Sequence, residues 1–291
     1  MANDTPTLRD AEEAYEQGDI ETTLAICDGL IGEDEAKAAP EVLYLAGECL
    51  LELQEPEEAL HLFDLALAQD PDSPLLVHCR GLCHFELGDF EQAKALFERA
   101  AAGAPELAEP VFYLGLVAER SGDFEGATTW FENAAKRDPE NFVVPIDWSA
   151  DDIKAAYDVM IEETPEPLGT WFAGLVVEVE DLPAEASLQR GGAALSPLVH
   201  CLFEGEPGEP PEGDDPAAWL KAEPTRVVLY RRNLGKSAQD EYELHREVFE
   251  AVLWEVMEFM GFDDSHLESL GVMELDEVQE GDDEDLHPSG R

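Results

Sequence analysis

The sequence predicts a multidomain protein in which an all-α repeat region is followed by an α+β region. A 34-residue periodicity in the first half, β-rich stretches in the second half and a long apolar helix near the C-terminus support this prediction. The length of 291 residues fits about two domains. We expect repeats over residues 1–140, a joint over 141–149, an α+β domain over 150–273 and an acidic, disordered tail over 274–291.

The repeats are visible as residues that recur at a constant step. Gly47, Gly81 and Gly115 are 34 residues apart, and Gly88 and Gly122 keep the same step with Gln54 as their earlier counterpart. Four further series follow it: Ala59, Ala93 and Ala127; Phe63, Phe97 and Phe131; Ala66, Ala100 and Ala134; and Pro71, Pro105 and Pro139. A weaker copy over residues 15–31 is offset by 36. We therefore expect helix–turn–helix units in which glycine admits a close helix and proline ends the second helix.

This pattern resembles the tetratricopeptide repeat, over about residues 5 to 140. The resemblance implies a right-handed solenoid whose first helices (the A helices) form a concave groove that binds peptides or other proteins. One subclass of the family clamps a carboxylate with basic and asparagine side chains. The A helices here offer little beyond Arg80 and Arg120, which we treat as candidate partner-binding residues without expecting that clamp.

The second half alternates between helix and strand signals. Residues 149–165 should form a helix with Ser149 as its N-cap, and residues 239–262 a long one. Strands are expected within 170–183, 195–205 and 225–233, with a flexible loop over 188–196 and a Pro/Gly/acid loop over 205–219.

The order of these elements resembles the small bacterial zincin-like metallopeptidase family over roughly residues 150–273. That family has a strand R-I-x-L-Y-R before a helix that carries H-E-x-x-H. The strand is matched by Arg226, Leu229, Tyr230 and Arg231. The helix and its exit are matched by Glu247, Val248, Val252, Glu255, Gly261, Asp263, Asp264, Leu267, Leu270 and Gly271.

The positions of the family's zinc chemistry are altered. By resemblance, Trp254 and Glu258 stand where the two histidine ligands would be, Glu255 stands at the general base and Asp264 at the third ligand. An indole offers zinc no lone pair, and two carboxylates alone bind it weakly. We therefore expect no bound metal, no cofactor and no catalysis from this domain.

Three interpretations of this helix face remain open. It is a solvated polar stripe, an acidic groove for a cation or a basic peptide formed by Glu247, Glu250 and Glu258 around Trp254, or a rearranged metal site of Glu258, Asp264 and His266. Trp254 and Glu258 are accordingly candidate partner-binding residues. Arg231 and Arg232 are two more, either facing a partner's carboxylate or pairing with the chain's own acids.

Cysteine usage and the N-terminus indicate a reducing compartment. The five cysteines are scattered and odd in number, and the first residues lack the basic and apolar regions of an export signal, so we expect a cytoplasmic protein with free thiols. Cys79 and Cys83 flanked by His78 and His84 are either a helical metal pair or small buried residues. The thiols are Cys27, Cys49, Cys79, Cys83 and Cys201.

The charge balance limits the possible partners. There are 68 acidic and 17 basic side chains, a net charge of -51, so nucleic acid and membrane surfaces are not expected partners. The excess of acidic side chains either binds a basic partner or keeps the protein soluble, including in a cell that lives at raised salt. These observations favour a protein-interaction adaptor or regulator with an inactive peptidase-like domain. The alternatives are a metal-dependent peptidase with non-standard ligands and an acidic chaperone for basic proteins.

Overall fold

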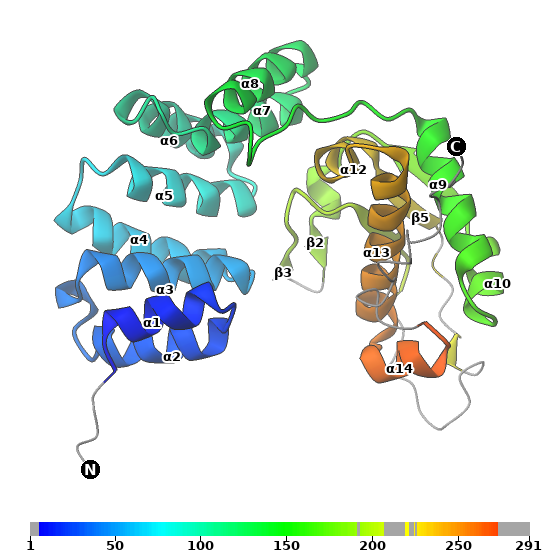
Figure 1. Cartoon of the computed structure of the whole chain (residues 1–291), viewed down its shortest axis with the longest axis horizontal. Coiled ribbons are helices and arrows are strands. Elements are labelled where there is room, and N and C mark those ends of the chain that lie inside the picture. Colours follow the sequence, from blue (N-terminus) through cyan, green and yellow to red (C-terminus); the bar gives the residue numbers. More distant parts are fainter. Residues whose placement is uncertain (1–5, 191–192, 207–218, 221–223, 225, 273–291) are drawn as a thin grey trace, which may run out of the picture. The chain divides into compact units, whose positions relative to one another are not determined.

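The computed structural model describes residues 6–190, 193–206, 219–220, 224 and 226–272. The chain divides into two compact units (Figure 1). Unit 1 comprises Met1–Ile146 and Leu182–Val199, and unit 2 comprises Asp147–Asp181 and His200–Arg291. The tail expected over 274–291 lies outside the described residues.

Unit 1 is built from consecutive helical hairpins, as the repeat period predicts. Its helices are α1 (Leu8–Glu16), α2 (Ile20–Ile31), α3 (Pro40–Glu52), α4 (Pro56–Gln69), α5 (Pro74–Glu86), α6 (Phe90–Gly103), α7 (Glu109–Arg120) and α8 (Phe124–Arg137), with a 3-10 turn η1 (Glu35–Lys37) between α2 and α3. Each odd-numbered helix packs against the even-numbered helix that follows it. The odd-numbered helices are the A helices of the repeats.

The recurring glycines and phenylalanines meet inside each hairpin. A Cβ atom added at Gly81 would lie 2.7 Å from a ring carbon of Phe97, closer than carbon atoms can approach. The same holds for Gly47 against Phe63 at 2.6 Å and for Gly115 against Phe131 at 2.5 Å. Glycine is therefore required where the phenylalanine ring of the second helix lies on the first helix, and this contact sets the separation of the pair.

The turn inside each hairpin explains another recurring position. Gly88 and Gly122 have φ of 76° and 80°, which glycine adopts without strain. Gln54 occupies the same place with φ of 60°, so its turn keeps the geometry despite a side chain. These turns reverse the chain between the two helices of a repeat.

Unit 1 also contains a short segment from the second half of the chain. Residues 182–199 hold a 3-10 turn η2 (Glu185–Ser187) and an antiparallel pair, β2 (Gln189–Arg190) and β3 (Ala193–Ala194). Leu198 packs against an apolar cluster that includes Phe85 and Leu116. The sequence prediction placed this segment in the 150–273 domain, whereas the structure packs it with the repeats in unit 1.

Unit 2 is an α+β domain. Its elements are α9 (Ala150–Glu163), α10 (Leu168–Ala173), β1 (Val177–Glu180), β4 (Cys201–Glu204), β5 (Arg226–Tyr230), α12 (Arg231–Ser237), α13 (Glu241–Met260) and α14 (Asp264–Ser269). The sheet order is β1-β5-β4. Strand β1 runs parallel to β5, with Val177 opposite Val227, and β4 runs antiparallel to it, with Cys201 opposite Leu229.

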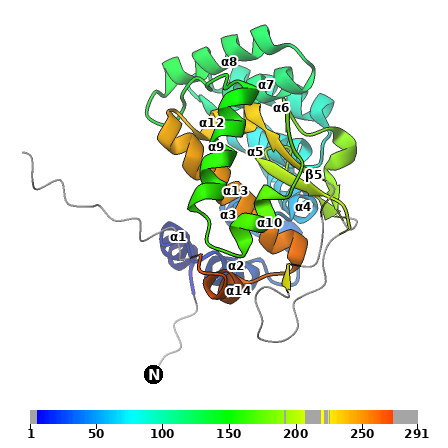
Figure 2. The ribbon, with the colours of Figure 1, turned by 90° about the vertical axis from the view of Figure 1, so that its right-hand side faces the viewer.

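Helix α13 packs against α9 and β4 and thereby encloses the core of unit 2 (Figure 2). Ser149 is the N-cap of α9, as predicted, and it forms a capping box with Asp152. The strand expected within 170–183 covers only Val177–Glu180, because residues 170–173 belong to α10, where Leu168 and Phe172 are buried one helical turn apart. Within the described residues, none of the helices has the length and apolarity needed to cross a bilayer.

Candidate functional site

Helix α13 carries Trp254, Glu255 and Glu258, the positions where the family has its first histidine, its general base and its second histidine, and these side chains do not all face the same way. Asp240 caps its start by accepting a hydrogen bond from the Glu243 amide, and Gly261 ends it in a left-handed conformation. Trp254 is 66% exposed and Glu258 is exposed, whereas Glu255 is only 4% exposed. The side chains at the two expected histidine positions therefore face solvent, and the one at the general-base position faces the core.

The Glu255 carboxylate has a structural partner. Its Oε1 atom accepts a buried hydrogen bond from the backbone N–H of Phe203 in strand β4, at 2.7 Å. Among the described strands, β4 lies at the edge of the sheet, so a backbone N–H that points away from β5 needs an acceptor from outside the sheet. The carboxylate supplies it, and it thereby fastens the long helix to the sheet edge.

The remaining expected ligand positions lie at the start of α14. Asp264 is exposed at the first residue of this helix. The His266 ring contacts two neighbouring residues. Its Nδ1 lies 2.5 Å from Asp263 Oδ1, and the ring stacks on Phe262 with centroids 5.4 Å apart. Over the described part of the chain, no three His, Cys, Asp or Glu side chains are grouped so as to hold a metal ion.

These residues do not fit a zinc ion. Trp254 offers an indole where an imidazole lone pair is required, and Oε1 of Glu255, at the expected general-base position, accepts a buried backbone hydrogen bond. Glu258 and Asp264 are solvated carboxylates. We therefore derive no hydrolytic step through a metal at this position.

The acidic stripe at the start of α13 is partly neutralised within the chain. Glu247 is paired with Arg246 at 3.3 Å and lies 3.6 Å from Nδ1 of His200, while Glu250 lies 3.5 Å from Arg246. Burial lowers the pKa of His200, which favours its neutral form. Its Nε2 lies 3.2 Å from the Ser237 hydroxyl. This end of the helix is thus a connected polar network.

The arginines of the expected basic patch also pair with acids of the chain. Arg231 donates to Asp181 at 2.6 Å, to the Trp148 carbonyl at 3.0 Å and to Asp147. Arg232 lies 3.7 Å from Asp147. Of the two interpretations of this patch, the contacts favour intramolecular pairing, which holds β1, β5 and the chain entering α9 together.

In unit 1, acidic and aromatic side chains share one surface of the A helices. This carboxylate face consists of Tyr44 and Glu48 on α3, His78 and Glu86 on α5, and Glu109 and Tyr113 on α7. His78 is 2% exposed, and its Nε2 lies 3.1 Å from a Glu109 oxygen. Hydrogen bonding to His78 lowers the pKa of Glu109, so this carboxylate remains ionised.

Two members of the carboxylate face are poorly solvated. Burial raises the pKa of both Glu48 and Glu86, although hydrogen bonds from Cys79 and Ser196 respectively oppose the shift. Oε1 of Glu48 and Oε2 of Glu86 are buried and accept no hydrogen bond from the described residues. Burial raises the pKa of Tyr113 as well, and Glu86, Glu109 and Glu48 add to that shift. The charged forms of Glu48 and Glu86 are therefore poorly compensated by the described residues of the chain.

The cysteines and arginines of the repeats have structural partners. Cys79 and Cys83 are 1% and 0% exposed, and burial raises the pKa of the Cys83 thiol to about 12, which favours the hypothesis of small buried residues. Arg80 pairs with Asp64 at 2.9 Å. Arg120 donates to the Pro183 carbonyl at 2.7 Å and lies over the Phe90 ring, 4.8 Å from its centroid.

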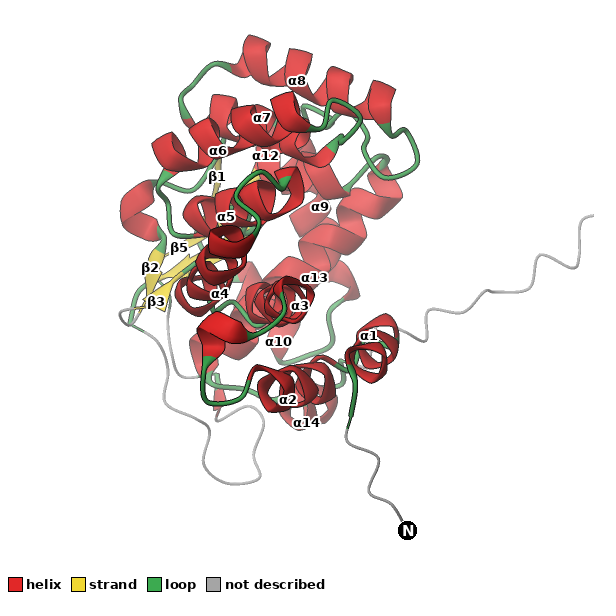
Figure 3. Ribbon diagram, turned by 90° about the vertical axis from the view of Figure 1, so that its left-hand side faces the viewer, coloured by secondary structure: helices red, strands yellow, loops and turns green. Residues whose placement is uncertain are grey.

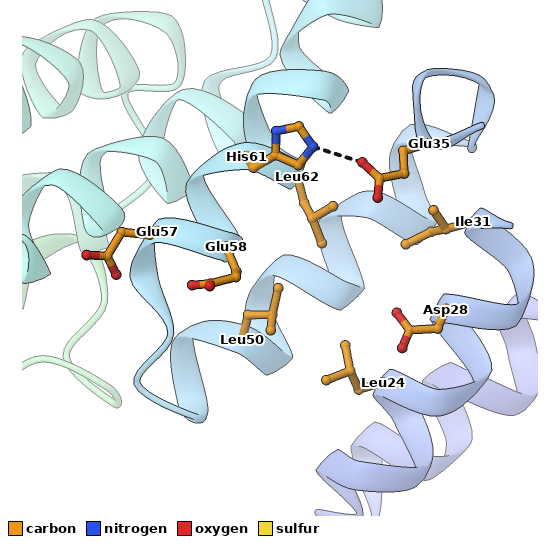
Figure 4. A pocket seen from close by; sticks show the side chains of 9 residues that line it. All are labelled: Leu24, Asp28, Ile31, Glu35, Leu50, Glu57, Glu58, His61 and Leu62. Carbon is orange, nitrogen blue, oxygen red and sulfur yellow. Dashed lines mark hydrogen bonds and ion pairs between the residues drawn. The ribbon is translucent and has the colours of Figure 1, made fainter. Parts of the chain in front are cut away.

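A pocket of about 440 Å³ lies where α2, α3 and α4 meet (Figure 4). Apolar side chains from all three helices line it, and His61 lies 2.8 Å from Glu35 across it. Its lining residues are Leu24, Asp28, Ile31, Glu35, Leu50, Glu57, Glu58, His61 and Leu62. Sequence reasoning missed this pocket. The spacing of Leu24, Asp28 and Ile31 along one side of α2 is the signal that it left unused.

Comparison with protein families supports both halves of the chain. Residues 14–78 and 80–142 match models of the tetratricopeptide repeat, and residues 172–273 match a model of the zincin-like metallopeptidases. The chain joins tetratricopeptide repeats to a zincin-like domain. The zincin-like match includes residues 182–199, which pack with the repeats.

Several solved structures are similar to part of the chain at low sequence identity. The crystal structure of MamA is 18% identical, with a TM-score of 0.40, over 52% of this chain and 81% of that one. A repeat protein of Thermus thermophilus is 21% identical, with a TM-score of 0.41, over 45% and 73% of the two chains. The first repeat domain of Spaghetti bound to an HSP90 peptide is 18% identical, with a TM-score of 0.37, over 39% and 89%. No curated protein matches the chain.

Proposed function

We propose that this protein is a non-catalytic cytoplasmic adaptor whose tetratricopeptide repeats bind a basic segment of another protein. The repeats themselves support a role in protein interaction. The zincin-like domain contributes a folded body joined to the repeats, without hydrolysing peptides. The observation that carries the non-catalytic part is the hydrogen bond between the Glu255 carboxylate and the Phe203 amide.

That hydrogen bond argues against catalysis for a chemical reason. A general base needs a lone pair within reach of the water that it activates. Glu255 is buried and its Oε1 atom is engaged by the backbone of β4, which holds the carboxylate in the core, whereas the neighbouring side chain that faces solvent is Trp254. Moving this carboxylate into a reaction would leave a buried N–H without an acceptor.

The choice of a basic partner rests on the carboxylate face. Acidic residues that only aid solubility lie in water, whereas Glu48 and Glu86 each hold a buried oxygen without a donor. A carboxylate removed from water is stabilised strongly by a cation that completes its hydrogen bonds. Lysine or arginine side chains of an extended partner segment supply such donors, and the rings of Tyr44 and Tyr113 contact their aliphatic stems.

Binding is tested with a fluorescein-labelled peptide of alternating lysine and serine, followed by anisotropy. We expect Glu48→Gln with Glu86→Gln to weaken binding by about tenfold, which corresponds to about 1.4 kcal/mol. The control is Glu98→Gln with Glu106→Gln, which removes the same charge from exposed positions of the repeats. Equal weakening by both pairs would mean non-specific attraction of polycations, and would favour the acidic chaperone.

Catalysis is tested separately on the purified chain. We expect no cleavage of a peptide library in the presence of zinc. Cleavage that is stopped by a chelator and by Glu255→Gln would instead establish the metal-dependent peptidase and overturn the non-catalytic proposal.

A further inference from the structure

The segment Leu182–Val199, which we call the strap, belongs to one unit by packing and to the other by its attachments. It leaves unit 2 after Asp181, at the end of β1, and returns to it at His200, before β4. Both attachment points are fixed in unit 2. Asp181 is paired with Arg231 at 2.6 Å, and the His200 carbonyl accepts from the Tyr230 amide at 2.9 Å.

The body of the strap contacts the C-terminal ends of the A helices. At its start, the Pro183 carbonyl accepts a hydrogen bond from Arg120 at the end of α7, at 2.7 Å. Near its end, Ser196 lies beside Glu86 at the end of α5, and both side chains line one small cavity. Leu198 packs into the apolar cluster that contains Phe85. Three separate contacts, two polar and one apolar, therefore hold it on the repeats.

The position of the strap overlaps the carboxylate face. Ser196 contacts a small cavity shared with Glu86 and with Leu51 and Gln54 at the end of α3. Figures 1 and 3 show β2 and β3 beside the ends of the repeat helices. Glu86, a member of the carboxylate face, thus already has a neighbour supplied by the chain itself.

The strap has little structure that would hold it together alone. Its strands have two residues each, and isolated hairpins of even greater length are only marginally stable in water. Its order therefore depends on packing against the rest of the chain, and Leu188 is 5% exposed while Pro183 and Pro197 are buried. Residues 191 and 192 lie outside the described part, and no contact above involves them.

We propose that the strap is a detachable ligand of the repeats, supplied in cis, which competes with a partner segment for the Glu86 end of the carboxylate face. The competition with a partner rests on the proposed function, whereas the docking itself does not. Because both ends of the strap are attached to unit 2, its effective concentration at the repeats is on the order of millimolar, and an outside segment must compete against that value.

The docking is tested with the strap added in trans. In one variant of the full chain, residues 183–198 are replaced by a glycine–serine segment of equal length. A labelled peptide with the sequence of residues 182–199 should bind this variant at least about tenfold more tightly than it binds the unaltered chain, whose site is filled. The same peptide with Leu198→Asp should not bind. Equal affinity for both chains, or binding to neither, would overturn the proposal.

A point variant tests the docking independently, in case the chain with the glycine–serine segment does not fold. Leu198→Asp in the full chain should speed hydrogen exchange at the Leu195 amide, which donates to Leu188 within the strap at 3.0 Å. Leu75→Asp, an exposed leucine of α5, should leave that exchange unchanged. Unchanged exchange in Leu198→Asp would count against docking.

The lysine–serine peptide separates the two proposals. If it binds the strap-free chain more tightly than the unaltered chain, the competition holds. If it binds both chains equally, the competition is refuted while the basic partner stands. If it binds neither chain while the strap peptide binds, the basic partner is refuted and the docking stands.

Discussion

Replacing Glu255 should destabilise unit 2, because the carboxylate accepts the buried Phe203 amide at 2.7 Å. In Glu255→Ala this amide loses its acceptor, which costs about 1–3 kcal/mol, and the lost side-chain packing adds about 1 kcal/mol. The expected loss of unfolding free energy is therefore about 2–4 kcal/mol. Glu255→Gln retains an acceptor oxygen and should cost about 1 kcal/mol.

The measurement is urea unfolding of the full chain followed by tryptophan fluorescence. Four of the five tryptophans lie in unit 2, namely Trp148, Trp171, Trp219 and Trp254, so the signal reports chiefly on that unit. With a urea dependence of about 2 kcal/mol per molar, a loss of 3 kcal/mol lowers the midpoint by about 1.5 M.

Glu258→Ala is the matched control, since Glu258 is exposed one turn from position 254 on the same helix. Its effect should stay within about 0.5 kcal/mol. If Glu255→Ala lowers the midpoint no more than Glu258→Ala does, the carboxylate has no structural role, and the argument that it is unavailable as a base fails.

Three further changes test other contacts. Burial raises the pKa of Glu48, so the folded state binds a proton more tightly than the unfolded state, and unit 1 should gain stability as the pH falls through that raised pKa. Glu48→Gln should weaken this pH dependence and add about 1 kcal/mol to the unfolding free energy at neutral pH. Circular dichroism melts at several pH values measure both effects, and an unchanged pH dependence would contradict the prediction. Gly81→Ala places a Cβ atom against the Phe97 ring and should lower the unfolding free energy by about 1–3 kcal/mol. In Gly29→Ala the added Cβ atom meets nothing within 4 Å, and the unfolding free energy should rise by up to about 1 kcal/mol. Similar melting temperatures for the two variants would refute the packing argument. Trp254→His combined with Glu258→His should create a zinc site, and metal analysis should find about one zinc ion per chain. The double variant should still not cleave peptides, because Glu255 remains hydrogen bonded to β4. Absence of zinc would show that the helix no longer holds the ligand geometry.

The repeats were predictable because their determinants are local. Gly81 and Phe97 lie in one hairpin, and their contact recurs in the next hairpin with Gly115 and Phe131. A fixed step in the sequence therefore reports a fixed contact in space. The start of α9 was equally local, since Ser149 and Asp152 form its cap within one turn.

The parts that escaped prediction depend on residues distant in sequence. Glu255 and Phe203 are 52 positions apart, so nothing in the helix motif indicates that the carboxylate faces an edge strand. The strap carries no repeat signal, and its attachment depends on Arg120, 63 positions before Pro183. Arg120 stands one repeat after Glu86, at the equivalent position, and this change of charge was the available clue.

The interleaved order of the two units has a practical consequence for anyone who wishes to express them separately. A gene fragment ending at Ile146 encodes all eight repeat helices but omits Leu182–Val199, so the apolar cluster that includes Phe85 and Leu116 loses the Leu198 side chain that packs against it. The complementary fragment keeps that stretch as an unsupported connection between β1 and β4. To reproduce each unit as it is folded in the full chain, residues 182–199 must be joined to the first fragment through a flexible linker. In the second fragment, a short linker must connect residues 181 and 200.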